Sequence, residues 1–291
     1  MMIPLVIGQE RSRIGNRKFY MKNKLINGEV LEVLGTVPNK IVDLGVTSPP
    51  YNKQEKNKGW LVKNVVYSEY KDKLPEDKYQ ENQVKVLNEV YRVTKDGGSF
   101  FYNHKIRWED GEMFHPMDWL RNTQWVIKQE IIWDRVIAGN IRGWRFWQVE
   151  ERVYWLYKPL DGNKKGKELS SKDAKMTSIW RSVPESNNPH PAPFPLWLPA
   201  RIIISLMEGK TEGLVLDPYV GSGTTAVASK LLGFDYLGID IGKEYIDYAE
   251  KRLQSANSEL DKIEKERELH KVIKTFKTRK EQGKNTGRYR I

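Results

Sequence analysis

The fold is decided by residues 214–240, which read LVLDPYVGSGTTAVASKLLGFDYLGID. A short apolar run at 214–216 ends in Asp217 and leads into a glycine-rich turn. A helix-like segment at 225–232 follows, and a second apolar run occupies 236–239. This order predicts strand, turn, helix and strand, which is the βαβ unit that lays an adenine–ribose cofactor across the carboxyl edge of a parallel sheet.

The turn and the acids beside it indicate the kind of ligand. Gly221 and Gly223 let the backbone approach a ligand closely, and Asp240 ends the second strand, where a carboxylate can accept from both ribose hydroxyls. A P-loop is disfavoured because no Lys follows the glycines. Asp217 would repel a pyrophosphate but bind an ammonium group. The turn therefore favours a cofactor with a cationic amino-acid end, such as S-adenosyl-L-methionine, with a purely structural turn as the alternative.

Charge and composition narrow the class of protein. The 291 residues carry a net charge of +11, and from Lys251 onward 13 Lys and Arg face 6 Asp and Glu. A polyanion is the expected partner, and a solvated, Lys-rich surface is the alternative. The absence of Cys excludes disulfides and thiolate metal sites, and four scattered His predict no metal. Without a membrane-length apolar run or a signal-peptide core, we expect a soluble, cytoplasmic protein.

A second motif follows a strand predicted at 41–46. Ser48, Pro49, Pro50 and Tyr51 come directly after it, and two prolines forbid the strand to continue. Ligands bind at this carboxyl edge in α/β folds. The Ser48 hydroxyl and the Pro49 carbonyl are two acceptors that could hold the exocyclic amine of a nucleobase and free its delocalised lone pair, while Tyr51 offers a face for a base outside the stack. The alternative is a purely structural turn.

Further elements follow from periodicity and turn residues. A helix begins after Pro75, and a turn is expected at residues 96–98. The remaining segments are strands at 24–30, 99–103, 125–133 and 149–157, an apolar helix at 196–207, a loop at 52–73 and a linker at 158–175. Strands that alternate with helices predict an α/β fold with a mainly parallel sheet.

The two motifs together resemble a known family. TSPPYN at 47–52, followed by DPYVGSGTT at 217–225, is similar to the DNA amino-methyltransferases, in the permuted β group that places the catalytic motif before the cofactor motif. The resemblance spans residues 24–253. It implies a Rossmann-like sheet with helices on both faces, S-adenosyl-L-methionine as cofactor and double-stranded DNA as substrate. It leaves a cognate restriction endonuclease and a homodimer open as further partners.

The resemblance also assigns roles to residues. The catalytic residues would be Ser48, Pro49, Pro50 and Tyr51. The cofactor-binding residues would be Glu29 at the adenine, Asp240 at the ribose, and Asp217, Tyr219, Gly221, Ser222, Gly223, Thr224 and Thr225 around the methionine end. The family more often carries Asp at position 29 and Phe at position 219. Residues 190–195 resemble its remaining cofactor segment.

DNA contacts are expected from an insert between the two halves. Tryptophans between Trp108 and Trp155 interleave with arginines, a mixture that suits stacking on bases and gripping phosphates, although core aromatics with snorkelling arginines are the alternative. The expected DNA-binding residues are Asn52, Arg135, Arg142, Trp144 and Arg145. The expected divisions are a basic arm at 1–23, a catalytic half at 24–134, a target-recognition insert with one core strand at 135–181, a cofactor half at 182–254 and a basic helical tail at 255–291.

Ser48 bears on the target base. Ser in this motif resembles the cytosine-N4 enzymes more than the adenine-N6 enzymes, which usually carry Asp. Cytosine N4 is therefore the expected target and adenine N6 the alternative, since both present an amine beside a ring nitrogen. More distant alternatives are an RNA methyltransferase, an inactive DNA-binding relative and a nicotinamide oxidoreductase, which would leave the Ser-Pro-Pro-Tyr turn unexplained.

Overall fold

A computed structural model describes residues 21–52, 73–138, 143–166, 168–170, 176–183 and 194–271, together with 280, 281 and 283. Most of the N-terminal arm, the loop at 53–72, Arg142, part of the linker, residues 190–193 and most of the tail beyond 271 lie outside them. Within the described residues, no helix is long and apolar enough to cross a bilayer.

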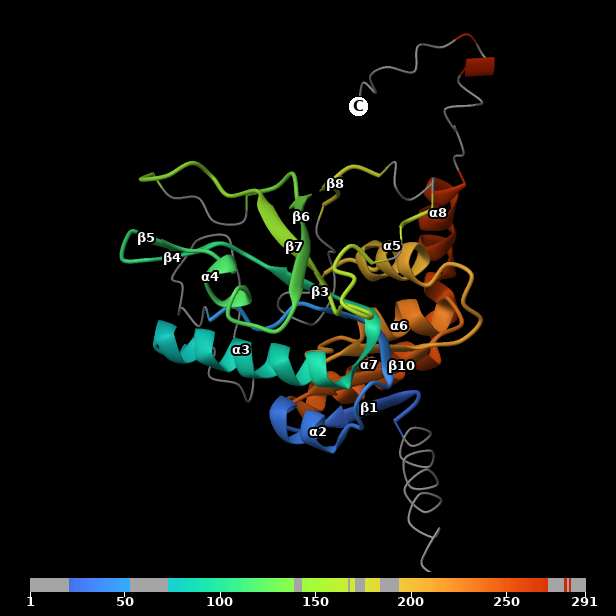
Figure 1. Ribbon diagram of the computed structural model, residues 1–291, viewed down its shortest axis with the longest axis horizontal. Helices are drawn as coiled ribbons and strands as arrows, with labels where there is room; N and C mark the ends of the chain where they lie inside the picture. Colours follow the sequence, from blue (N-terminus) through green and yellow to red (C-terminus); the bar gives the residue numbers. More distant parts are fainter. Residues whose placement is uncertain are drawn as a thin grey trace, which may run out of the picture.

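Eight strands form one sheet in the order β1-β10-β9-β2-β3-β7-β6-β8 (Figure 1). They are β1 (Lys24–Asn27), β2 (Val42–Thr47), β3 (Thr94–His104), β6 (Val126–Asp134), β7 (Glu150–Tyr157), β8 (Ile179–Arg181), β9 (Leu214–Asp217) and β10 (Asp235–Asp240). From β1 to β3 all neighbours are parallel, β7 is antiparallel to both β3 and β6, and β6 is parallel to β8. The expected mostly parallel α/β sheet is confirmed.

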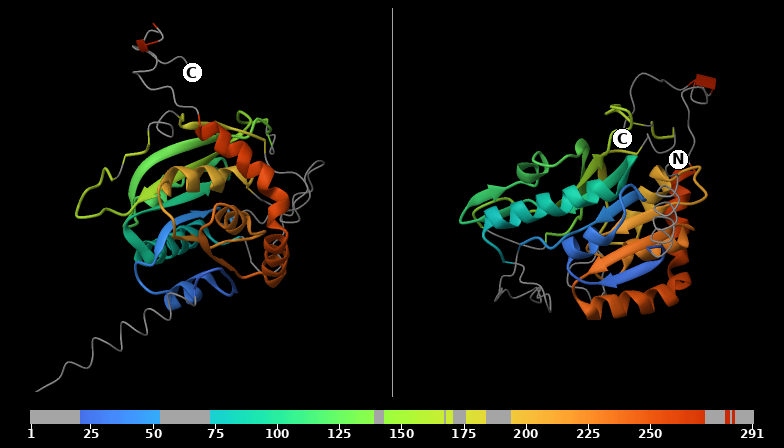
Figure 2. Two further views of the ribbon diagram at one scale, coloured as in Figure 1. Left: turned by 90° about the vertical axis from the view of Figure 1, so that its right-hand side faces the viewer. Right: turned by 60° about the horizontal axis from the view of Figure 1, so that its bottom comes forward.

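Helices cover both faces of this sheet. One face packs against α5 (Trp197–Leu206), α6 (Thr224–Leu231), α7 (Lys243–Gln254) and α8 (Leu260–His270), and the other against α2 (Val30–Thr36), α3 (Glu76–Val93) and α4 (Met117–Leu120). Figure 2 (left) shows α5 and α8 in front of the strands. The strands serve both cores because alternate side chains point to opposite faces: Val215 packs with α5 and α6, while Leu214 and Leu216 pack with α2 and α3.

Small elements extend the frame. A hairpin, β4 (Arg107–Glu109) and β5 (Glu112–Phe114), follows β3. A 3₁₀ turn, η2 (Ala256–Glu259), joins α7 to α8. The turn expected at 96–98 lies inside β3, where Gly97 has φ +79° and the pairing with β2 shifts its register between Val42 and Leu44. Residues 95–98 lie opposite the single residue Asp43, so the predicted turn is an irregularity between two paired parts of one strand rather than a turn that precedes the strand.

The position of β2 decides where the site lies. β2 pairs with β9 on one side and with β3 on the other, in parallel. Because the carboxyl ends of parallel strands meet at one edge, the Ser48 turn after β2 and the glycine turn after β9 emerge side by side.

Candidate active site

Two hydrogen bonds join the cofactor motif to the carboxyl end of β2, where the Ser48 turn begins. The Thr47 hydroxyl donates to Oδ1 of Asp217 at 2.6 Å, across 170 positions of sequence. The Thr225 hydroxyl donates to the Val46 carbonyl at 3.3 Å. Two turns far apart in the chain therefore lie side by side at one edge of the sheet.

Asp217, which precedes the glycine turn, is a buried carboxylate with a shifted pKa. Its side chain is 1% exposed. Oδ1 accepts from Thr47 and from the amide of Tyr219 at 3.1 Å, whereas Oδ2 has no hydrogen-bond partner among the described residues. Burial raises the pKa of Asp217 to about 6, and the nearby hydroxyls of Thr47 and Thr225 offset part of that shift. A buried, unsatisfied carboxylate oxygen fits the ammonium group of a methionine-type cofactor.

Asp240 holds the glycine turn by accepting hydrogen bonds from backbone amides. Gly221 donates its amide to Oδ2 of Asp240 at 2.9 Å, and Gly242 donates to Oδ1 at 2.9 Å. Gly223 has φ +83°, and a Cβ there would lie 2.7 Å from the Cβ of Ala249 on α7. Only glycine therefore allows α7 to pack this closely behind the turn. Asp240 ends β10 as expected, and its ribose contact stays a prediction.

Arg252 supports the turn from α7, a role that sequence reasoning missed. Its guanidinium donates to the Ser222 carbonyl at 3.2 Å and to the Thr224 hydroxyl at 3.0 Å. Glu259 pairs with the same group at 2.7 and 3.0 Å. Burial opposes the charge of Glu259, but hydrogen bonds from Arg252 and Lys262 lower its pKa to about 2. The only signal in the sequence is a basic residue on an amphipathic helix, which does not reveal its target.

Glu29 lies at the start of α2. Its carboxylate caps the helix, accepting from the amides of Leu31 at 2.8 Å and Glu32 at 3.0 Å. β1 ends beside β10, where Asn27 pairs in register with Asp240. Glu29 therefore lies at the same edge of the sheet as the predicted ribose ligand, and its adenine contact stays a prediction.

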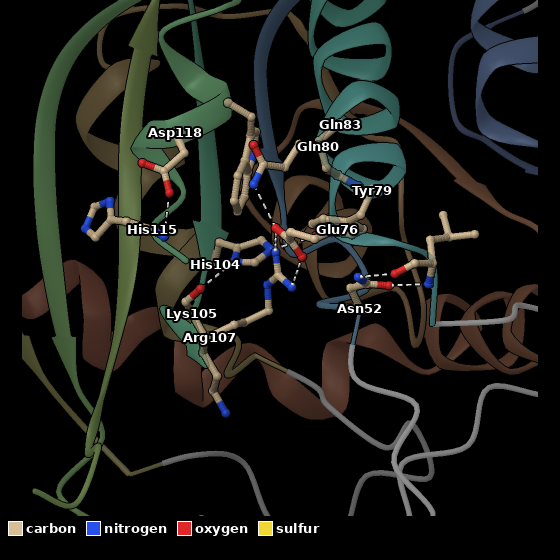
Figure 3. Close-up of polar contacts among 12 residues, drawn as sticks. Asn52, Glu76, Tyr79, Gln80, Gln83, His104, Lys105, Arg107, His115 and Asp118 are labelled. Atoms are coloured by element: carbon tan, nitrogen blue, oxygen red, sulfur yellow. Dashed lines mark hydrogen bonds and ion pairs between the residues drawn. The ribbon is translucent and has the colours of Figure 1, made fainter. Parts of the chain in front are cut away.

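The Ser48 turn is fixed by a web of side chains. The Ser48 and Tyr51 hydroxyls lie 2.6 Å apart. Tyr79 on α3 donates to the Pro50 carbonyl at 2.8 Å, and its hydroxyl lies 2.7 Å from Nε2 of His104. Asn52 exchanges two hydrogen bonds with the Leu74 backbone, at 2.7 and 2.9 Å (Figure 3). The DNA contact expected of Asn52 stays a prediction, and the structure gives its amide this anchoring role.

The arginines and tryptophans divide into two groups. The first group fits the core alternative. Arg107 is buried and makes two 2.6 Å bonds to Glu76 (Figure 3), with its guanidinium 4.6 Å from the centre of the Tyr79 ring. Trp119 and Trp133 are buried as well. The mixed pattern therefore marks the core over much of its length.

The second group is exposed. Trp144, Phe146 and Trp147 are 57%, 99% and 58% exposed. The Arg145 guanidinium lies 3.9 Å from the centre of the Trp108 ring and 5.6 Å from that of Trp144. Arg135 instead turns inward and pairs with Glu151 at 2.7 Å. Of the predicted DNA-binding residues that the structure describes, Trp144 and Arg145 lie together on the surface.

The sequence of the chain is similar to those of known DNA methyltransferases. A family model described as DNA methylase, of the N6/N4 type, matches residues 42–251, more than half of the chain. The type II methyltransferase M.BglII of Bacillus subtilis is 29% identical over 260 residues, which cover 78% of this chain and 68% of that protein. M2.DpnII of Streptococcus pneumoniae is 29% identical over 262 residues, which cover 83% and 94%.

Solved structures show the same fold. The PvuII DNA methyltransferase, which is cytosine-N4-specific, superposes with a TM-score of 0.62 at 18% identity and covers 83% of this chain and 92% of that one. A DNA modification methylase of Thermus thermophilus in complex with S-adenosyl-L-methionine superposes with a TM-score of 0.59 at 24% identity, covering 80% and 95%. The chain therefore belongs to the N6/N4 DNA methylase family and is a DNA methyltransferase that uses S-adenosyl-L-methionine.

Proposed function

We propose that this methyltransferase modifies the exocyclic N4 amine of a cytosine flipped out of duplex DNA, as the modification enzyme of a type II restriction–modification system. The observation that carries the proposal is the 2.6 Å bond from Thr47 to Asp217, which joins the Ser48 turn to the cofactor turn. Type II methyltransferases among its relatives support the biological setting.

The chemistry needs acceptors more than it needs a strong base. An exocyclic amine is a poor nucleophile because its lone pair is delocalised into the ring. The Ser48 hydroxyl and the Pro49 carbonyl would hold its two hydrogens, draw the nitrogen towards tetrahedral geometry and free the lone pair. When bound, the cofactor supplies a sulfonium methyl group as the electrophile: the S–CH₃ bond would break as the N–CH₃ bond forms, and the methylated amine would release one of its two protons. In-line approach within roughly 3–3.5 Å is what the protein has to arrange.

Residues of the chain divide this work between the two turns. Asp217 would hold the cofactor's ammonium group through Oδ2, since its other oxygen is occupied by Thr47 and Tyr219. Tyr51 would offer its ring to the flipped base. Thr47 couples the two sites, because it lies beside Ser48 and bonds to Asp217.

The choice of cytosine rests on Ser48. A neutral hydroxyl at this position resembles the cytosine-N4 enzymes, and the PvuII enzyme with its cytosine-N4 specificity shares the fold. Adenine N6 is the second candidate, because the matching family model covers both the N6 and the N4 type and the same turn can accept from either amine.

The surface cluster of three exposed aromatic side chains, Trp144, Phe146 and Trp147, and the half-buried Arg145 supports DNA binding by the insert. Aromatic side chains can stack on bases or pack against sugars, and Arg145 adds a positive charge for phosphate. We assign target recognition to this cluster. Its three large aromatic side chains are more than half exposed and do not pack in the core, and such exposed apolar groups are typical of binding surfaces.

Product analysis tests the proposal. The purified chain is incubated with S-adenosyl-L-methionine and unmethylated genomic DNA, the DNA is digested to nucleosides, and these are separated by mass spectrometry. N4-methylcytosine is the expected product. N6-methyladenine alone would overturn the base assignment, and methylation of structured RNA in preference to duplex DNA would overturn the substrate. If the cofactor binds but no methyl group is transferred, the chain is an inactive DNA-binding relative.

A further inference from the structure

A buried carboxylate lies behind the Ser48 turn. Glu151, on β7, is 7% exposed. Its Oε2 accepts from the Tyr51 hydroxyl at 3.1 Å and from Nδ2 of Asn103 at 2.8 Å. Its Oε1 forms ion pairs with Arg135 at 2.7 Å and with Lys105 at 3.3 Å. Five side chains from distant parts of the chain therefore meet at the base of the turn.

The charge of Glu151 decides which group donates in each hydrogen bond of this cluster. Burial opposes the charge of Glu151, but Lys105 and Arg135, with hydrogen bonds from Asn103 and Tyr51, lower its pKa. An ionised carboxylate only accepts hydrogen bonds, so the single hydroxyl proton of Tyr51 points at Glu151. In the 2.6 Å contact between Ser48 and Tyr51, the donor must then be Ser48.

Asn103 leaves this direction unchanged. Its Nδ2 lies 2.8 Å from Tyr51, 2.8 Å from Glu151 and 3.3 Å from Ser48. An amide nitrogen has two hydrogens, and the two shorter contacts use both of them. The lone pairs of Ser48 therefore stay available to a substrate. The hydroxyl proton of Ser48 points to Tyr51, away from the substrate.

We propose that Glu151 is a positioning residue that acts through the Tyr51 hydroxyl and fixes Ser48 as a hydrogen-bond acceptor towards the target amine. This inference rests on the proposed function, in which Ser48 accepts from that amine. Without the carboxylate, Tyr51 could donate to Ser48, and Ser48 would then present its proton to an amine that is itself a donor.

Glu151→Gln should reverse the chain of hydrogen bonds with almost no change in shape. Arg135 and Lys105 are donors, so they would hold the amide oxygen on their side. The amide NH₂ would then face Tyr51 and Asn103. Two NH₂ groups cannot bond to each other, so Asn103 would turn its amide, and its oxygen, which has no hydrogen-bond partner among the described residues of the wild type, would accept one hydrogen while Tyr51 accepts the other. Tyr51 would turn its proton to Ser48, which would become a donor towards the substrate.

The measurement is steady-state transfer of labelled methyl groups to unmethylated genomic DNA, with cofactor affinity measured by calorimetry. We expect Glu151→Gln to lower kcat by about tenfold to a hundredfold, as misplaced groups at a reacting atom do, while KM and Kd for the cofactor change less than about twofold. Glu151→Asp, which keeps the charge, should recover part of kcat. Glu150→Gln is the matched control: Glu150 is the next residue on β7, points to the other face and pairs with Arg152 at 3.1 Å.

A double-mutant cycle tests the route through Tyr51. Tyr51→Phe removes the hydroxyl and keeps the ring, so adding Glu151→Gln to it should cost little more. Equal kcat in wild type and Glu151→Gln, or fully additive losses, would overturn the inference while the proposed function stands. Absence of transfer by the wild type would overturn both. Should Glu151→Gln fail to bind cofactor, Tyr51→Phe decides: lower kcat at unchanged cofactor affinity supports the route, and unchanged kcat overturns it.

Discussion

Asp217→Asn should stabilise the apoprotein while it weakens cofactor binding. The wild-type carboxylate is buried and one of its oxygens has no hydrogen-bond partner among the described residues, so its charge is costly in the absence of a cation. Its pKa rises from 3.8 to about 6 on folding. The folded state therefore binds a proton more tightly than the unfolded chain, and stability falls as pH rises through this window.

The magnitude follows from the shift. At ~1.4 kcal/mol per pH unit, a shift of about 2 units corresponds to about 3 kcal/mol of stability lost above pH 6. The neutral amide removes this penalty, but its buried NH₂ costs about 1 kcal/mol of its own. The net gain at pH 7 is about 2 kcal/mol, or a rise in Tm of about 4–8 °C. Below pH 4 the wild-type group is protonated, and the advantage should vanish.

Thermal unfolding of both proteins between pH 4 and pH 8 checks this prediction, and calorimetry measures cofactor affinity at pH 7. Loss of a charged hydrogen bond to the ammonium group should weaken binding by about tenfold to a hundredfold. The control is Asp43→Asn on β2. Burial opposes the charge of Asp43, but Lys95, Leu214 and Lys210 lower its pKa, so its amide should destabilise the protein at pH 7. If Asp217→Asn melts below wild type at pH 7, or if its advantage persists below pH 4, the reasoning fails.

Three further changes probe the turns and the surface. Ser48→Ala should lower kcat while cofactor affinity, measured by calorimetry, stays unchanged; equal loss of both would contradict the role assigned to the turn. Gly223→Ala forces a Cβ to 2.7 Å from that of Ala249 at φ +83°, so denaturant unfolding should show a loss of about 1–3 kcal/mol, and a wild-type midpoint would refute the close packing. Trp144→Ala should weaken DNA binding by about 1–3 kcal/mol in a fluorescence titration, whereas Leu269→Ala, at an exposed site on α8, should not; equal effects would deny the insert its role.

Local chemistry made the two motifs predictable. The unit β9–α6–β10 lies within one or two residues of its predicted bounds, because an apolar run, two glycines and a second apolar run each have a short-range meaning. β2 was found for the same reason, since two prolines end it. The adjacency of the turns followed once both were placed at the carboxyl edge of one parallel sheet.

Long-range partners were not predictable. Glu151 and Asn103 meet only because β7 runs antiparallel beside β3, where Asn103 pairs in register with Val153, and no local pattern fixes that neighbour. Arg107 lies among the tryptophans like Arg145, yet one is buried against Glu76 and the other lies on Trp108. Their spacing among the tryptophans does not separate the two arginines, because the difference comes from α3, whose Glu76 lies 31 positions before Arg107.

A structure of the protein with S-adenosyl-L-methionine tests most directly whether the two turns form one reaction centre. The expected complex has the ammonium group within hydrogen-bond distance of Oδ2 of Asp217 and the methyl group facing the Ser48 turn. A cofactor whose ammonium group is held elsewhere, or whose methyl group faces away from Ser48, would contradict it.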